Sequence, residues 1–271
     1  MASLARSSPR SVGRGLRLPD WALPFAGVLS VLVLFELLSR TGAIDRRSFP
    51  PVTTMLRALL DQLGTSEFWT AVGQTMEGWA LGLGIAAAAA IPLGIVLGSS
   101  ILAYRSLRAV IEFLRPIPSV ALIPLAVLVY GTGLESKVFL AVYASFWPIL
   151  MQALYGVQDV DPVTMDTARS FGFGRLARLR RVTLPSSLPY VATGLRISSA
   201  VALILAVTAE LVIGSPGLGR EINAARQGGA TDVMYALIIV TGLIGWLLNI
   251  VFVRIERRAL HWHPSHRRVV A

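Results

Sequence analysis

The sequence predicts an all-α protein: a polytopic membrane helix bundle with six transmembrane helices. Of its 271 residues, 54% are hydrophobic and only 15% are charged, and the mean hydropathy is +0.65. A soluble domain carries about 25% charged residues. Apolar runs long enough to cross a bilayer alternate with polar segments that are rich in arginine. Such runs are expected to form helices, because a lipid-exposed backbone must satisfy its hydrogen bonds internally.

The first apolar run, residues 21–38, follows a polar and basic segment, residues 1–20. A cleaved signal peptide is the alternative interpretation, because a basic region precedes an apolar one. No small-residue cleavage site follows the run, and Arg40, Arg46 and Arg47 come next. Residues 21–38 are therefore expected to be an uncleaved transmembrane helix, with a disordered cytoplasmic tail before it.

Residues 41–70 are expected to lie outside the cytoplasm. Pro50 and Pro51 precede the stretch VTTMLRALLDQL, whose apolar spacing is that of a short amphipathic helix. The second span, residues 77–98, is rich in glycine and alanine. Small side chains let helix backbones approach closely in lipid, so this helix is expected at the centre of the bundle.

The third span, residues 109–130, contains three prolines, Pro116, Pro118 and Pro124. A short cytoplasmic turn with Arg105 and Arg108 is expected before it. Prolines inside a helix kink or break it. A kink is the structural interpretation of Pro116 and Pro118, and a place along a translocation pathway is the functional one, since a broken helix can line a cavity. The fourth span is expected over residues 137–157.

A charged insert, residues 160–189, separates the fourth and fifth spans. Asp161 is a good helix N-cap and Pro162 suits the first helical position. Gly172 stands where a left-handed residue ends a helix, and a second short helix is expected from Arg175. A basic amphipathic loop that lies on anionic lipid is one interpretation of this insert.

The spacing inside the insert supports a second interpretation. Asp166, Thr167 and Ala168 are followed after three residues by Gly172, and after nine more by Val182-Thr-Leu-Pro. This resembles the EAA motif of ABC-importer permeases, although Asp166 replaces the usual glutamate and Thr167 an alanine. The resemblance implies that the insert, named here the coupling segment, docks on an ATPase in the cytoplasm. It assigns this role to Asp166, Thr167, Ala168, Arg169, Gly172, Leu184 and Pro185.

The fifth span, residues 190–213, carries Glu210 toward its outer end. An ionisable side chain inside a membrane span is a functional candidate by default. The same family shows a similar Ala-Glu pair followed by Gly-Leu-Gly, as at residues 217–219 here. A role in the pathway or gate and an ion pair that holds helices together are both open for Glu210. Residues 215–232 are expected outside the cytoplasm, and the sixth span over residues 233–253.

The net charge of +10 would suggest nucleic-acid binding in a soluble protein. Here the arginines fall mainly in the segments between spans. With both termini inside, the cytoplasmic segments hold 16 arginines and the outer segments seven basic residues, one of them Lys137. This excess follows the positive-inside rule. It predicts a multi-pass bacterial inner-membrane protein with both termini in the cytoplasm and no nucleic-acid partner.

The chain contains no cysteine, which excludes disulfides and thiolate metal sites. Its three histidines, His261, His263 and His266, lie in the C-terminal segment, residues 261–271. They could bind a metal, but a solvated basic tail is the preferred interpretation, and no metal site is predicted. No cluster of cationic residues within the spans indicates anion binding.

The family resemblance extends over about residues 50–260, and the proline-rich stretch LRPIPSVALIPLAVLVYGTG closely resembles the branch that imports sulfonates, taurine and nitrate. It implies a type I ABC-importer permease domain over residues 21–260. The chain has no G-x-x-x-x-G-K-[ST] motif, so it is not expected to bind ATP or to be an enzyme.

The resemblance also implies the partners and the solute. The partners are a second permease copy, two ATPase subunits that bind ATP and Mg²⁺, and an extracytoplasmic substrate-binding protein. A sulfonate or taurine is the first expectation for the solute, with nitrate, bicarbonate or a vitamin precursor as alternatives. An ATPase-independent secondary transporter is the rival class, but it often carries inverted repeats and several intramembrane charges. The sequence shows no repeat, and Glu210 looks nearly alone.

Overall fold

The computed structural model describes residues 22–260, and no β-strand occurs among them. The two predicted tails and the three histidines lie outside the described residues. The residues expected to form one transmembrane domain divide into two compact units, the first ending at Met55 and the second beginning at Leu56. Within the described range, five helices are long and apolar enough to cross a membrane, and one bent helix pair brings the number to six.

The first unit contains helix α1 (Ala22–Arg40) and the turn that follows it. Ser39 Oγ donates a hydrogen bond to the Phe49 carbonyl at 2.8 Å, which closes the turn. Glu36 forms an ion pair with Arg40 at 2.6 Å and accepts a hydrogen bond from the Thr53 N–H at 3.1 Å. Glu36 therefore fixes the start of α2 (Val52–Leu63), the short amphipathic helix expected after the two prolines.

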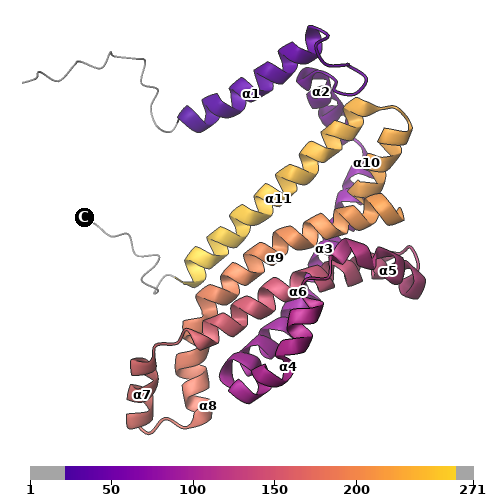
Figure 1. Cartoon of the computed structure of the whole chain (residues 1–271). Coiled ribbons are helices and arrows are strands. Elements are labelled where there is room, and N and C mark those ends of the chain that lie inside the picture. Colours follow the sequence, from indigo (N-terminus) through magenta and orange to yellow (C-terminus); the bar gives the residue numbers. More distant parts are fainter. Residues whose placement is uncertain (1–21, 261–271) are drawn as a thin grey trace, which may run out of the picture. The chain divides into compact units, whose positions relative to one another are not determined.

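The second unit is built mainly on four long helices: α3 (Ser66–Ser99), α6 (Leu134–Gln158), α9 (Leu184–Ile213) and α11 (Thr231–Ala259) (Figure 1). Helix α3 has 34 residues and begins well before the predicted start at residue 77. Its N-cap Thr65 accepts a hydrogen bond from the Phe68 N–H at 3.3 Å. The start of α3 is therefore marked in the sequence by its capping residue. Hydropathy marks only where the apolar part of this helix begins.

Helix α6 occupies the centre of this unit, because it packs along both α3 and α9. Glycines of α3 lie directly against it. A Cβ atom on Gly94 would lie 2.6 Å from Ala153 Cβ and 2.8 Å from the Leu150 carbonyl oxygen. The glycine-rich α3 was expected at the centre; its small residues instead form one side of a seam whose other side is the central helix.

The third predicted span is not one helix. It consists of α4 (Ile101–Leu114), a 3₁₀ turn (Ser119–Leu122) and α5 (Ile123–Tyr130), with a bend of 81° between the two parts. Pro116 and Pro118 lie at the break, which accords with their missing N–H groups and fixed backbone. Ser100 caps α4 directly after α3 ends, so Arg105 and Arg108 lie in a helix and not in the turn that was predicted there.

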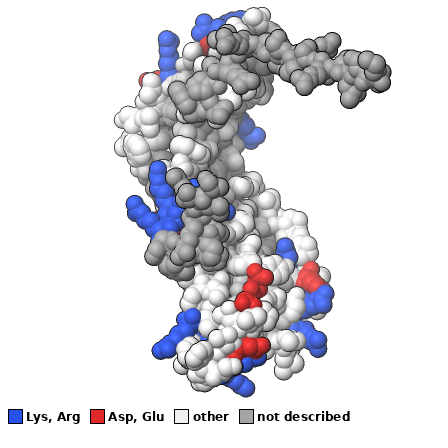
Figure 2. Space-filling view, turned by 90° about the vertical axis from the view of Figure 1, so that its left-hand side faces the viewer, with Lys and Arg blue, Asp and Glu red and all other residues white. Residues whose placement is uncertain are grey.

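The coupling segment forms α7 (Pro162–Ser170), a single helical turn α8 (Arg175–Arg178) and a π-helical turn that leads directly into α9. Helix α9 therefore begins at Leu184, before the predicted start at residue 190. In Figure 2, charged side chains of both signs gather at the lower end of the molecule, the end that carries α4, α7 and α8 in Figure 1. The segment predicted outside the cytoplasm contains another helix, α10 (Leu218–Gln227).

Candidate functional site

Glu210 has a charged partner that the sequence did not reveal. Lys137 Nζ lies 2.9 Å from Glu210 Oε1, and the two side chains are 2% and 0% exposed. Lys137 lies in the first turns of α6, and Glu210 lies near the end of α9. The assignment of Lys137 to an outer segment was wrong, and so was the impression that Glu210 is nearly alone. A lone charge at the edge of each of two apolar runs was the only sequence signal for this pair.

The ammonium group of Lys137 uses all three of its donors. Besides the carboxylate of Glu210, it donates to the carbonyl of Gln74 in α3 at 2.8 Å. It also donates to the carbonyl of Pro216, in the turn after α9, at 2.9 Å. One buried cation therefore connects α6 to α3, to α9 and to the turn between α9 and α10.

The second carboxylate oxygen of Glu210 is equally well satisfied. It accepts a hydrogen bond from Thr75 Oγ1 and another from the Gly219 N–H, both at 2.9 Å. Thr75 Oγ1 in turn accepts from the Leu218 N–H at 2.9 Å. We call this set the Lys137–Glu210 network. It satisfies the charges that burial would otherwise leave unpaired.

Three glycines leave the space that this network needs. Gly217 has φ +147°, and a Cβ there would overlap the Glu210 carboxylate. A Cβ on Gly219 would lie 2.6 Å from Glu210 Cβ, and one on Gly78 would lie 2.5 Å from Lys137 Cε. The Ala-Glu and Gly-Leu-Gly elements that resemble the permease family are thus parts of one packed arrangement. Because the carboxylate is buried and fully hydrogen-bonded, a gate role for Glu210 requires the network to open and stays a prediction.

The prolines proposed for the pathway lie apart from this network. Pro116 lines a cavity between α4 and α6, and the residues that line that cavity do not include Glu210. Pro118 is the N-cap of the 3₁₀ turn after the break. The structure therefore brings Pro116 and Pro118 together at the helix break.

Helix α7 in the coupling segment has well-defined ends. The Asp161 carboxylate accepts hydrogen bonds from the Val163 N–H and the Thr164 hydroxyl, both at 3.0 Å. At the other end, Gly172 has φ +73° and its N–H donates to the Arg169 carbonyl at 2.9 Å, while the Phe173 N–H donates to the Ala168 carbonyl at 3.0 Å. This is a Schellman ending, for which glycine is the preferred residue.

The other residues assigned to coupling lie in or next to α7 and at the start of α9. Asp166 and Arg169 form an exposed ion pair at 2.8 Å, and Thr167 Oγ1 donates to the Val163 carbonyl. Ala168 is buried at the base of a groove of about 300 Å³. The groove is lined by Val163, Thr164, Thr167, Ala168, Phe171, Phe173 and Val182.

The coupling segment is fastened to the bundle at both of its ends. Leu184 and Pro185 form the first turn of α9, where a proline is tolerated. The Tyr190 hydroxyl, one turn further along, donates a hydrogen bond to the Asp159 carboxylate at the end of α6. The arrangement can therefore transmit a displacement of α7 to α6 and α9 together.

Asp161→Ala should raise amide hydrogen exchange at Val163 and Thr164 by about threefold to tenfold. The N–H of Val163 and the hydroxyl of Thr164 hold the pKa of the Asp161 carboxyl below its usual value. Because the folded-state pKa is lowered, this stabilisation is present above the ordinary carboxyl pKa and is lost as the pH falls through the lowered value.

Hydrogen–deuterium exchange of the α7 peptide at pH 7 measures the effect. Asp161→Asn is the control, because its amide oxygen caps a helix about equally well and should keep most of the protection. Equal exchange in the wild type and in Asp161→Ala would show that the cap does not hold α7.

Comparisons with known proteins identify the family to which this chain belongs. A family model for the "Binding-protein-dependent transport system inner membrane component" matches residues 90–260. The taurine transport system permease protein TauC of Escherichia coli (strain K12) is 35% identical over 243 residues, which cover 88% of each chain. The nitrate import permease protein NrtB of Leptolyngbya laminosa is 31% identical over 257 residues, which cover 90% of this chain and 91% of the relative.

The fold is also similar to that of a solved transporter. A chain from an inward-facing conformation of the MetNI methionine ABC transporter superposes with a TM-score of 0.57 at 18% identity, and the match covers 78% of this chain and 98% of that one. The matched family model spans well over half of the present sequence, including α6, the coupling segment, α9 and both members of the Lys137–Glu210 pair. The chain therefore belongs to the family of binding-protein-dependent inner membrane components and is a type I ABC-importer permease.

Proposed function

We propose that this permease imports a small sulfonate, with taurine as the first candidate, and that ATPase subunits drive it through the coupling segment. The observation that carries the coupling role is the apolar surface on that segment. Val163 and Phe171 are 71% and 76% exposed beside the groove over Ala168. Exposed apolar side chains around a concave patch are typical of a protein interface.

The fastened ends of the segment support a rigid mechanism. A partner that grips α7 would displace the ends of α6 and α9, because Asp159 and Tyr190 connect them. Both helices pack against each other along the second unit. ATP-driven closure of the partner subunits would then swing the permease between inward and outward states, as a rigid-body movement through a packed contact.

The remaining parts of the proposal follow from the relatives and from the distribution of charge. The complex would contain two copies of this chain, two ATPase subunits that bind ATP and Mg²⁺, and an extracytoplasmic binding protein that delivers the solute. Both termini would lie in the cytoplasm. The taurine permease relative supports a sulfonate, and the nitrate permease relative supports nitrate as the first alternative, ahead of bicarbonate or a vitamin precursor.

Co-purification tests the coupling role without any solute. The chain is expressed with candidate ATPase subunits, and the ATPase retained per permease is measured. Phe171→Asp and Gly172→Arg should each lower retention by about tenfold or more, as loss of an interface hot spot does. Phe171 is exposed, so its replacement should leave the unfolding transition of the permease alone unchanged.

Gly174→Ala is the matched control. Neither Gly172 nor Gly174 has a neighbour within 4 Å of a built Cβ, but only Gly172 has a positive φ. If Gly174→Ala retains the ATPase and the other two variants lose it, the result supports docking through α7. Full retention by Phe171→Asp and Gly172→Arg would show that the ATPase does not bind this segment.

A further inference from the structure

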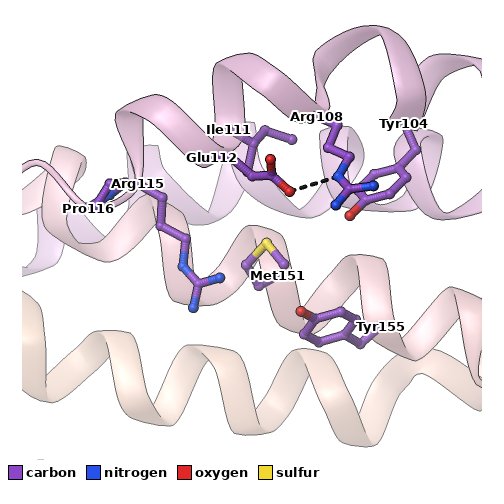
Figure 3. A pocket seen from close by; sticks show the side chains of 8 residues that line it. All are labelled: Tyr104, Arg108, Ile111, Glu112, Arg115, Pro116, Met151 and Tyr155. Carbon is purple, nitrogen blue, oxygen red and sulfur yellow. Dashed lines mark hydrogen bonds and ion pairs between the residues drawn. The ribbon is translucent and has the colours of Figure 1, made fainter.

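The cavity at the helix break combines charge, phenol groups and apolar walls. Its volume is about 410 Å³, and it lies between α4 and α6 (Figure 3). Its lining comes from the break, from one face of α4 and from the last turns of α6: Tyr104, Arg108, Ile111, Glu112, Arg115, Pro116, Met151 and Tyr155. No role is assigned to this cavity by the coupling mechanism.

The cavity carries one positive charge that nothing in the described residues neutralises. Arg108 Nε lies 2.7 Å from Glu112 Oε1, so these two side chains compensate each other. No hydrogen bond or ion pair joins the guanidinium of Arg115 to any residue in the range 22–260. In Figure 3, Arg115 extends from the break toward α6, and the phenol of Tyr155 points into the same space.

This gathering of side chains follows from where α4 begins. Because the helix starts at Ile101, Tyr104, Arg108 and Arg115 recur at a spacing that places them on one face. Hydropathy alone places Arg108 in a turn and Arg115 in a span, and this separation hides the cationic cluster. Arg115 is exposed and lies in the break between the two helices of the bent pair, so its guanidinium is accessible to an anion in the cavity.

The chemistry of the lining selects the kind of ligand. A guanidinium binds an oxoanion through two parallel hydrogen bonds. Ile111 and Met151 are nearly buried and offer an apolar wall. The cavity therefore complements a small oxoanion with a short alkyl group.

We propose that this cavity is a transit site for a small organic oxoanion, with Arg115 bound to the sulfonate group and Met151 against the alkyl group. The inference rests on the proposed import of a small sulfonate and adds the site at which the permease itself recognises it. Tyr155 lies three residues before the end of α6, and the coupling segment follows. The solute would therefore meet Arg115 on the cytoplasmic side of the break, before release. A phospholipid phosphate is a second source of the same anion chemistry.

Saturation-transfer NMR on the full chain in phosphatidylcholine nanodiscs tests the site, with methanesulfonate as the probe. The methyl group of methanesulfonate should receive saturation transfer from the wild type. With Arg115→Gln this transfer should fall by about tenfold or more, since one charge-assisted contact is removed. Arg115→Lys keeps the charge and should retain part of the signal. Methylammonium, a cation of similar size, should show none with any variant.

Arg105→Gln is the matched control, because Arg105 lies on the same helix but does not line the cavity. It should keep the full signal, and all variants should unfold at the temperature of the wild type. No transfer with the wild type, or equal transfer with Arg115→Gln, would overturn the site.

Nanodiscs with about one-fifth phosphatidylglycerol form the second arm. Loss of transfer there would overturn the transit role and assign the cavity to a lipid headgroup, whereas retained transfer supports it. These outcomes are independent of ATPase co-purification, so a failed site and a failed coupling role can be distinguished.

Discussion

Lys137→Met should lower the free energy of unfolding of the second unit by about 3–5 kcal/mol, the cost of leaving one partner of a buried ion pair without the other. The substitution removes the partner of Glu210 and leaves the Gln74 and Pro216 carbonyls without their donor. Methionine has a similar length and should fill the same space. Unfolding of the purified chain by sodium dodecyl sulfate in mixed micelles measures the change.

A double-mutant cycle shows whether the loss comes from the pair. Glu210→Gln alone should also destabilise strongly, because Lys137 is then the unpaired charge. The double variant Lys137→Met/Glu210→Gln should recover a large part of the loss, since replacing both partners of a buried pair is often close to neutral. Strictly additive losses would mean that the two side chains do not interact as the structure shows.

Arg169→Met provides a comparison on an exposed pair in the same unit. The Arg169–Asp166 ion pair has nearly the same length as the buried one, 2.8 Å, but its side chains are 61% and 69% exposed. Exposed pairs contribute about 0–1 kcal/mol, so this substitution should change stability little. The contrast attributes most of the effect at Lys137 to burial, because each pair joins one cation to one carboxylate at nearly the same distance.

The double variant also decides between the two interpretations of Glu210. A folded Lys137→Met/Glu210→Gln protein that imports solute normally would assign the network to holding α3, α6 and α9 together. A folded protein that retains its ATPase but does not import would assign the network to the gate. Stability and transport are thus measured on the same variant, so a structural role of the network can be separated from a role in the gate.

The coupling segment could be predicted from the sequence because its determinants are local. The cap at Asp161 and the turn at Gly172 each depend on a few neighbouring residues, and both are present in the structure. The Lys137–Glu210 pair could not be predicted from the sequence, because its members are 73 residues apart and meet only when α6 packs on α9. Local chemistry specifies helix ends, whereas the partner of a buried charge is specified by the packing of whole helices.

The cavity at Arg115 shows how one misplaced boundary hides a site. Hydropathy placed the start of the third span at residue 109, because Arg105 and Arg108 lower the apolar average before it. The structure starts α4 at Ile101, directly after its Ser100 cap, and so includes both arginines in the helix. Hydropathy marks where the apolar part of a span begins, whereas capping residues mark where the helix begins. The two positions differ wherever a helix carries charged residues at its end.

Gly94→Leu should destabilise the second unit strongly, because α3 and α6 are in backbone contact there. Even a single Cβ atom on Gly94 would lie 2.6 Å from Ala153 Cβ and 2.8 Å from the Leu150 carbonyl oxygen. Leucine would force the two helices apart along a seam that includes Leu97 and Leu154. Overpacking costs typically about 1–3 kcal/mol and more when backbone must move, so a loss at or above the upper value is expected.

Gly84→Leu is the matched control for this experiment. It makes the same change in the same helix, but nothing lies within 4 Å of a Cβ built on Gly84. Leucine has a higher helix propensity than glycine by somewhat under 1 kcal/mol, so this variant should be as stable as the wild type or slightly more stable. Unfolding in mixed micelles compares Gly94→Leu with Gly84→Leu directly. Equal losses of unfolding free energy would show that the glycines matter to α3 through their backbone conformation and not through contact with α6. Opposite signs would show that glycine is needed on the α6 side of α3 and dispensable on its open face.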